Sequence, residues 1–156
     1  MALTFFVAAL KCVYCGNVSP ADTSTNMQSH LLPHPGDLRV GDAADVHIED
    51  FESSYFKLRD PAPGGPVTVL ETWNCPYCHA QNWAFVIFQG QVVRDICSVR
   101  LNTDAIDKAQ FISDLIEEWC LDHGGEHLSE GLEPAKDIAD KVRKCVSKAE
   151  AENEHR

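Results

Sequence analysis

The chain has 156 residues, of which 44% are hydrophobic and 24% are charged, and its formal net charge is -11. This composition is typical of a globular protein that buries a core of its own, so metal binding need not supply all of its stability. The negative charge repels phosphate backbones, which disfavours nucleic-acid binding and favours basic partners.

The cysteine count indicates a reducing compartment. An odd number of cysteines, with four of them in C-x-x-C pairs, does not suit a disulfide framework, so we expect a cytoplasmic protein. The apolar opening Met1 to Leu10 ends at Lys11. It is too short to cross a bilayer and has no basic region before it, so we expect no membrane association.

The first two segments are a predicted strand and a long loop. Leu3 to Lys11 is rich in β-branched and aromatic residues, which predicts a buried strand, although its alanines also tolerate a helix. Residues 17–45 contain three prolines and many small polar residues, which indicates a loop with short strand-like patches at 31–32 and 38–40. Loops of this length are usually functional or disordered.

Short strands are predicted on both sides of the Pro- and Gly-rich turn at 61–66. Imperfect alternation predicts one strand at Val46 to Glu49 and another over Tyr55 to Arg59. Val67 to Trp73 follows the turn as a further strand. Its pattern leaves two choices for the buried set: Val67, Val69 and Glu71, or Thr68, Leu70 and Thr72.

The next two runs predict a β-hairpin. Trp83 to Gln89 and Gln91 to Arg100 flank Gly90, which suits a tight turn. Together with the strand at 67–73 they predict a meander of three consecutive antiparallel strands.

The last third of the chain predicts two helices. Asn102 or Thr103 is a suitable N-cap, and apolar residues at helical spacing predict one helix that ends at Gly124 and Gly125. Pro134 suits the first position of a second helix, which runs to about Ala149. The narrow apolar stripe of this second helix suggests docking along one edge of the domain or onto a partner.

Two C-x-x-C pairs, Cys12 with Cys15 and Cys75 with Cys78, predict a metal site. Each pair presents two thiolates from one tight turn, and two pairs complete the tetrahedral sphere that Zn²⁺ prefers. The 59 residues between Cys15 and Cys75 make this pairing a long-range staple. Because the cost of closing a loop rises slowly with its length, the separation is permissible. We expect all four cysteines to hold one structural zinc ion.

The residues around these cysteines resemble the zinc-ribbon, or zinc-knuckle, class over Lys11 to Gly16 and Trp73 to Val99. Cys-Val-Tyr-Cys-Gly is the usual knuckle form, whereas Cys-Pro-Tyr-Cys is followed by His79 where glycine is commoner. Histidine tolerates positive φ better than most residues. The resemblance implies a structural metal site but no particular function, because zinc ribbons occur in transcription factors, ribosomal proteins, enzymes and inhibitors.

Rubredoxins also pair a C-x-x-C-G knuckle with a C-P-x-C knuckle, around redox-active iron. They are much shorter than this chain and their knuckles lie closer together. An iron-based electron carrier stays open as a third functional alternative.

The remaining cysteines and the histidines predict no second site. Cys97, Cys120 and Cys145 are expected to be buried thiols. Cys120, His123 and His127 resemble a metal group, but the glycine pair breaks the helix between the two histidines. His30 and His34 fall in the long loop. No nucleophile elbow, phosphate-binding loop or H-E-x-x-H motif occurs, so we expect no enzymatic activity.

These patterns predict an α+β fold in which an antiparallel sheet carries the four-cysteine zinc ribbon and two C-terminal helices follow. Residues 1–102 would form the zinc-ribbon β domain with its 17–45 loop, and residues 103–156 a helical segment packed on it.

The functional expectation is a non-enzymatic acidic binding module. An inhibitor or immunity-type protein that neutralises a basic toxin or nuclease would have this size and charge. The expected contacts are the 17–45 loop, the acidic segment Asp42 to Glu52 and the last helix. The alternative is a nucleic-acid-associated accessory factor, whose only local support is Arg94 and Arg100 near two aromatic residues, Trp83 and Phe88.

Overall fold

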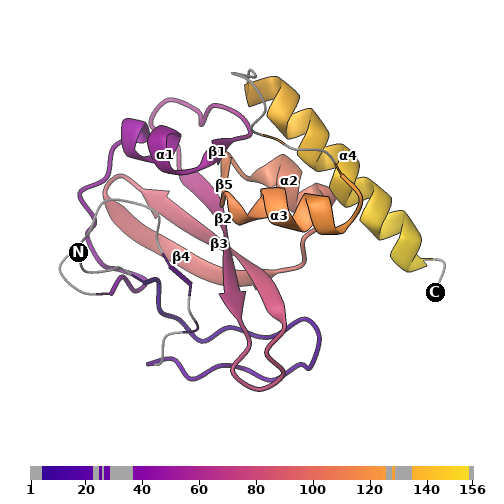
Figure 1. The fold of residues 1–156 in the computed structure, drawn as a ribbon. Coiled ribbons are helices and arrows are strands. Elements are labelled where there is room, and N and C mark those ends of the chain that lie inside the picture. The colour runs from indigo at the N-terminus through magenta and orange to yellow at the C-terminus, as the bar shows by residue number, and fades with distance from the viewer. Residues whose placement is uncertain are drawn as a thin grey trace.

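The computed structural model describes residues 5–22, 25, 27–28, 37–125, 128 and 135–154. The described residues form one sheet with helices around it (Figure 1). The helices are α1 (Ile48–Ser54), α2 (Thr103–Lys108), α3 (Leu115–Asp122) and α4 (Ala135–Glu154). The strands are β1 (Phe56–Lys57), β2 (Val67–Asn74), β3 (Gln81–Gln89), β4 (Val92–Val99) and β5 (Phe111–Ile112).

The predicted meander forms one side of the sheet, with β4 at its edge. The strand order is β1-β5-β2-β3-β4, and both the β2–β3 and the β3–β4 pairs are antiparallel. β2 pairs with β3 along its whole length, from Val67 opposite Phe88 to Asn74 opposite Gln81. The second C-x-x-C pair therefore lies in the β2–β3 turn.

The expectation of a purely antiparallel sheet is wrong, because β5 pairs in parallel with β2. The single helix expected from residue 103 to the glycine pair is also wrong: α2, β5 and α3 occupy that stretch. Phe111 and Ile112 favour a strand, and Gln110 directs them onto β2, where its N–H donates to the Thr68 carbonyl at 2.9 Å. The apolar spacing looked continuous because α2 and α3 bury residues against the same face of the sheet.

The N-terminal segment is extended but does not join this sheet. Phe5, Phe6 and Lys11 form isolated bridges only, so the expected regular strand is wrong for the described residues 5–11. The partners of the segment come from the predicted long loop: the Phe6 N–H donates to the Met27 carbonyl and the Val7 N–H to the Leu38 carbonyl, both at 2.9 Å. Leu3, Thr4 and the patch at 31–32 lie outside the described residues.

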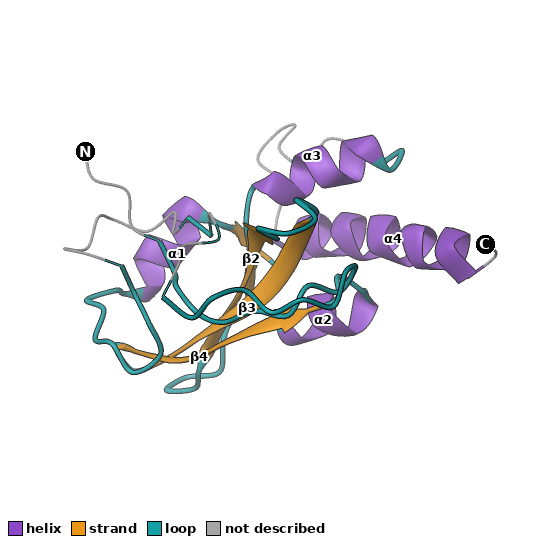
Figure 2. Cartoon of the chain, turned by 90° about the horizontal axis from the view of Figure 1, so that it is seen from below, coloured by secondary structure: helices purple, strands orange, loops and turns teal. Residues whose placement is uncertain are grey.

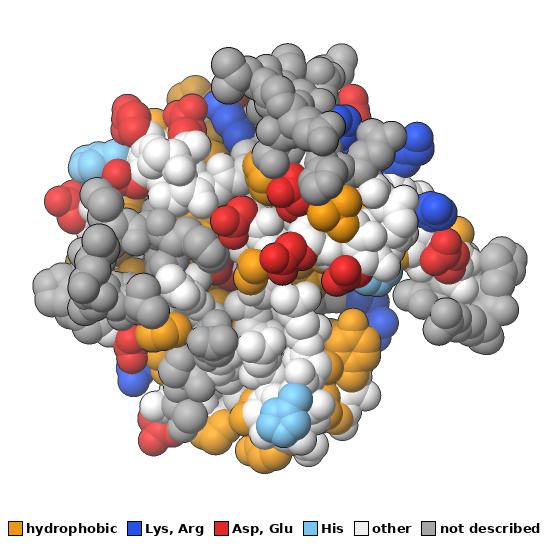
Figure 3. All heavy atoms as spheres, viewed as in Figure 1, with side chains coloured by type: hydrophobic (Ala, Val, Ile, Leu, Met, Phe, Trp, Pro, Cys, Tyr) orange, Lys and Arg blue, Asp and Glu red, His pale blue; other side chains and the backbone are white. Residues whose placement is uncertain are grey.

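The strand expected at Val46 to Glu49 is wrong, because α1 begins at Ile48. Acidic residues in the first turn favour the helix, and Asp50 Oδ2 accepts a hydrogen bond from the His47 N–H at 2.8 Å. The strand expected over Tyr55 to Arg59 is present only as the two-residue β1. Figure 3 shows acidic side chains gathered at the upper left, over α1.

Both faces of the sheet are covered. Val69 and Trp73 belong to a cluster with the N-terminal segment and α1, whereas Leu70 belongs to a second cluster with α2, α3 and α4. Figure 2 shows α1 at one end of the sheet and the other helices at the opposite end. Side chains on both faces of β2 are therefore buried, so neither of the two sets predicted from the sequence is the exposed one. Even the Glu71 side chain is buried.

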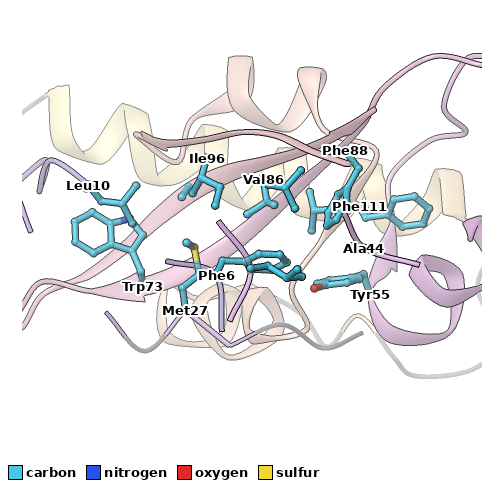
Figure 4. Close-up of a cluster of buried hydrophobic side chains, with 14 of the residues drawn as sticks. Phe6, Leu10, Met27, Ala44, Tyr55, Trp73, Val86, Phe88, Ile96 and Phe111 are labelled. Atoms are coloured by element: carbon cyan, nitrogen blue, oxygen red, sulfur yellow. The ribbon is translucent and has the colours of Figure 1, made fainter. Parts of the chain in front are cut away.

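Aromatic side chains join the N-terminal segment and α1 to the sheet (Figure 4). The ring of Phe88 on β3 lies 6.0 Å from that of Phe6 and 5.1 Å from that of Phe51, both edge to face. Phe51 in turn stacks on Phe111 of β5 at 5.5 Å. These contacts lock three separate segments of the chain together.

α4 spans Ala135–Glu154 and so continues beyond the expected end near Ala149, whereas Pro134, the expected first residue of this helix, lies outside the described residues. Its buried residues Val142, Cys145, Val146 and Ala149 follow the narrow stripe of the sequence. Among the helices of the described residues, none has the length and apolar character needed to span a membrane.

The aromatic cluster yields the first prediction. Phe88→Ala removes a fully buried ring and leaves a cavity between three segments, so we expect a loss of about 3–5 kcal/mol in the free energy of unfolding. Urea denaturation followed by circular dichroism measures it. Val40→Ala, at a side chain that is 52% exposed, serves as the control and should cost less than about 0.5 kcal/mol. Equal stabilities of the two variants would contradict this account of the core.

Candidate metal centre

The first knuckle is a tight turn closed by its own backbone. The Cys12 N–H donates to the Asn17 carbonyl at 2.9 Å, and the Gly16 N–H donates to the Cys12 carbonyl at 3.1 Å. Gly16 has φ of 78°, a conformation that glycine adopts without steric cost. This backbone path turns both thiols of the pair toward the same side.

The second knuckle repeats this geometry in the turn between β2 and β3. The Cys75 N–H donates to the Ala80 carbonyl at 3.0 Å, and the His79 N–H donates to the Cys75 carbonyl at 2.9 Å. His79 occupies the position of Gly16 and has φ of 64°. The departure from glycine therefore leaves the knuckle geometry intact.

The two knuckles bring all four thiols together. The Sγ atoms of Cys12, Cys15, Cys75 and Cys78 lie within 4.8 Å of one another. The Cys12–Cys78 and Cys15–Cys75 sulfur pairs are each 3.6 Å apart. A tetrahedral Zn²⁺ with Zn–S bonds of about 2.3 Å requires sulfurs about 3.8 Å apart, so the cluster fits such an ion with little adjustment.

Backbone N–H groups point at the buried sulfurs. Cys12 Sγ accepts from the N–H groups of Tyr14 at 3.4 Å and Cys15 at 3.5 Å. Cys75 Sγ accepts from Tyr77 and Cys78 at the same two distances. Because these donors stabilise negative charge on sulfur, each turn prepares its first cysteine to act as a thiolate ligand.

Asn82 on β3 contacts the thiol cluster through its side-chain amide, and it was not among the site residues predicted from the sequence. Its Nδ2 donates to Cys12 Sγ at 3.4 Å and to the Ala80 carbonyl at 3.1 Å, while its Oδ1 accepts from the Val13 N–H at 3.0 Å. The side chain is 1% exposed and ties the first knuckle to the second. The sequence feature that could have indicated its role is its position, since Asn82 is a polar amide residue directly before the apolar run that starts at Trp83.

The environment separates the pKa values of the thiols. Burial disfavours the Cys12 thiolate, but the N–H groups of Cys15 and Tyr14 and the Asn82 amide outweigh it and lower the pKa to about 6. The Ala80 N–H lowers the pKa of Cys78, but burial and the neighbouring thiols outweigh it and raise that pKa to about 12. Thiols this close cannot all ionise unless a cation balances their charge.

The donor set defines the chemistry that the centre supports. Four thiolates fill a tetrahedral sphere, whereas catalytic zinc keeps a position open for water or substrate. The arrangement therefore suits a structural ion that fastens the 12–15 turn to the β2–β3 turn. Within the described ranges, no other group of His, Cys, Asp or Glu side chains has metal-binding geometry.

The other residues considered from the sequence lie elsewhere. Cys97 is partly buried on β4, and Cys120 and Cys145 are buried where α3 meets α4. The imidazole of His123 stacks on the Trp119 ring at 3.9 Å. His30, His34 and His127 lie outside the described residues.

Comparisons with known proteins add no identification: no family model, no curated protein and no solved structure matches the chain. The fold and the possible metal site that the four cysteines form are therefore the features from which a function can be inferred.

Removing one ligand tests the centre. Cys78 is exposed, so Cys78→Ser leaves no core cavity but deletes a thiolate, and we expect less than one metal equivalent to survive dialysis against a chelator. Hydrogen exchange should accelerate in the first knuckle. Cys97→Ser, outside the cluster, should keep one equivalent by elemental analysis. Full metal retention by Cys78→Ser would refute this ligand assignment.

Asn82 gives a second, subtler test. Asn82→Leu keeps a similar volume but removes the contacts to Cys12 and Val13, so we expect metal affinity to fall by about 10–100-fold. Competition with a chromophoric chelator measures the change. Gln81→Leu, at the exposed neighbouring position, provides the matched control and should bind metal as the unmodified chain does. Equal affinities in the two variants would exclude a supporting role for Asn82.

Proposed function

We propose that this protein is a non-enzymatic binding module, stabilised by a structural zinc ion, that uses its acidic surface to bind a basic protein partner. An inhibitor or immunity-type protein that neutralises a basic toxin or nuclease is the specific form of this proposal. The observation that carries it is the closed set of four thiols, which suits a scaffold better than a reaction centre.

Zinc is the preferred ion for a physical reason. A tetrahedral sulfur site binds Zn²⁺ more tightly than Fe²⁺ in the usual affinity order of divalent metals. The rubredoxin-like alternative uses the same ligands, so the ion itself must be measured. Elemental analysis of the purified chain distinguishes the two, and colour does so independently, because ferric iron held by four thiolates is red whereas zinc is colourless.

The acidic segment Asp42 to Glu52 supports the choice of partner. It contains five carboxylates and no lysine or arginine. Asp45, Glu49 and Glu52 are exposed in and just before α1, and Figure 3 shows several acidic side chains in this region of the surface. Such a surface attracts a basic partner over several ångströms and accelerates its association. α1 is held to the sheet through Phe51, so the carboxylates are presented on a fixed frame.

Charge reversal on α1 tests the proposal. The tagged, metal-loaded chain should retain a basic protein from an extract of its source cells at low salt, and mass spectrometry identifies that protein. With the purified partner, Glu49→Lys with Glu52→Lys should weaken binding by about tenfold or more, because like charges then face each other. Raising the salt concentration should weaken the unmodified complex.

The matched control reverses two exposed carboxylates elsewhere. Glu118→Lys with Asp122→Lys on α3 changes the net charge equally and should bind the partner nearly as well as the unmodified chain. Equal loss in both double variants would mean that net charge alone governs binding. Retention of nucleic acid alone, or of no partner, would defeat the proposal.

One observation supports the nucleic-acid alternative. Lys11, Tyr14 and Arg100 line a hollow of about 500 Å³ beside the first knuckle, and Tyr14 is 69% exposed. The aromatic residues first considered, Trp83 and Phe88, are buried and offer no stacking face. A gel-shift assay with single-stranded nucleic acid at low and physiological salt separates this alternative from protein binding.

A further inference from the structure

A small pocket lies where the C-terminal end of α3 meets α4. Both helices lie at the end of the sheet opposite α1 (Figure 2). Its volume is about 250 Å³. The residues that matter for its chemistry are Gly124, Gly125, Lys141, Lys144, Cys145 and Lys148. Lysines, glycines and a thiol thus meet in one recess of a strongly acidic chain.

The rim of the pocket is cationic. Within the described part of the chain, neither Lys144 nor Lys148 forms an ion pair, and no carboxylate lines the pocket. The Lys148 ammonium lies 3.6 Å from the position that a Cβ on Gly124 would take. A small anionic molecule is therefore the class of ligand that this recess attracts.

A second thiol lies directly behind the first. Cys145 Sγ is 3.7 Å from the Cys120 carbonyl oxygen, and both cysteines belong to the same buried cluster. Gly125 makes this approach possible, because a Cβ there would lie 3.1 Å from Cys145 Sγ and 3.2 Å from Cys120 Cβ. The two side chains are 8% and 1% exposed, respectively.

We propose that Cys145 and Cys120 form a thiol–disulfide exchange site for small anionic disulfides of the glutathione disulfide class. Cys145 reacts first, because it lines the pocket. Cys120, which does not line the pocket, then attacks the mixed disulfide on Cys145. The product is an internal disulfide that ties α3 to α4. This site is independent of the metal centre and of the acidic binding surface.

The exchange balances in two steps. Cys145 sulfur attacks one sulfur of glutathione disulfide, whose S–S bond breaks; a protein–glutathione S–S bond forms, and the released glutathione thiolate takes the proton of Cys145. Cys120 sulfur then attacks Cys145 sulfur, and the second glutathione leaves with the proton of Cys120. Overall, two protein thiols are oxidised to one disulfide and glutathione disulfide is reduced to two thiols.

The proposed order agrees with the surroundings of Cys120. Burial, followed by the hydrogen bond with the Cys145 thiol, raises the pKa of Cys120 well above its usual range. A thiol in that environment is a poor first nucleophile. It acts once Cys145 carries the glutathione, because the Cys145 sulfur is packed against Cys120.

The test uses the full, zinc-loaded chain with glutathione disulfide, followed by alkylation and peptide mapping by mass spectrometry. In the unmodified chain we expect a Cys120–Cys145 disulfide, with a mass loss of two hydrogens. Cys120→Ser should accumulate the glutathione adduct on Cys145, and Cys145→Ser should form neither product. Circular dichroism and metal content verify that both variants are folded.

Charge selectivity tests the role of the pocket. Lys144→Glu with Lys148→Glu should slow the reaction with glutathione disulfide by about three- to tenfold but leave the rate with neutral hydroxyethyl disulfide unchanged. Arg39→Glu with Arg94→Glu changes the net charge equally at exposed positions outside the pocket and should leave both rates unchanged. The proposal fails if Cys145 stays fully alkylatable, if Cys97 or the metal ligands react in its place, or if the lysine and arginine variants react at the same rate.

Discussion

The closure of the chain between Cys15 and Cys75 is the constraint that positions the N-terminal segment over one face of the sheet. The N-terminal segment does not join the sheet; it crosses one face with few backbone pairings. The thiol cluster holds the end of this segment against the β2–β3 turn. Leu10 and Phe6 then pack into the buried cluster on one face of the sheet, where Leu10 lies beside Trp73 (Figure 4).

The opposite end of the same face is fixed by aromatic packing. Phe88 contacts both Phe6 and Phe51, so the sheet holds the start of the described N-terminal segment and α1 through one side chain. The N-terminal segment is therefore held at two points: at Cys12 and Cys15 by the thiol cluster, and at Phe6 by aromatic packing against Phe88. The second cluster, under α2, α3 and α4, has no direct part in the thiol site. Loss of metal should consequently loosen one layer while the other layer keeps its packing.

The knuckles and the β2–β3–β4 meander could be predicted from the sequence, because each depends on residues that are close together along the chain. Each knuckle is a short motif with its own turn chemistry, and the meander follows from three apolar runs joined at a C-x-x-C turn and at Gly90. β5 was missed because Ala109, Ile112 and Ile116 keep helical spacing, although a strand separates α2 from α3. Its position depends on the Gln110–Thr68 contacts, which join residues distant in the sequence. Asn82 was missed for the same reason, since its role exists only once Val13 lies beside it.

The chain places six of its seven thiols in two environments, which decide what each group can do. At the knuckles, N–H donors surround the sulfurs and a second pair of thiols faces the first, which favours a divalent cation. Between α3 and α4, the thiols meet a carbonyl oxygen, a glycine and lysine ammonium groups, with no further ligand among the described residues to complete a metal sphere. Exchange with a small disulfide is the reaction that we propose for this thiol pair. The two sites lie in different layers, since Cys12 and Cys75 belong to one buried cluster and Cys120 and Cys145 to the other, so we expect oxidation of the α3–α4 pair to leave the knuckle geometry in place.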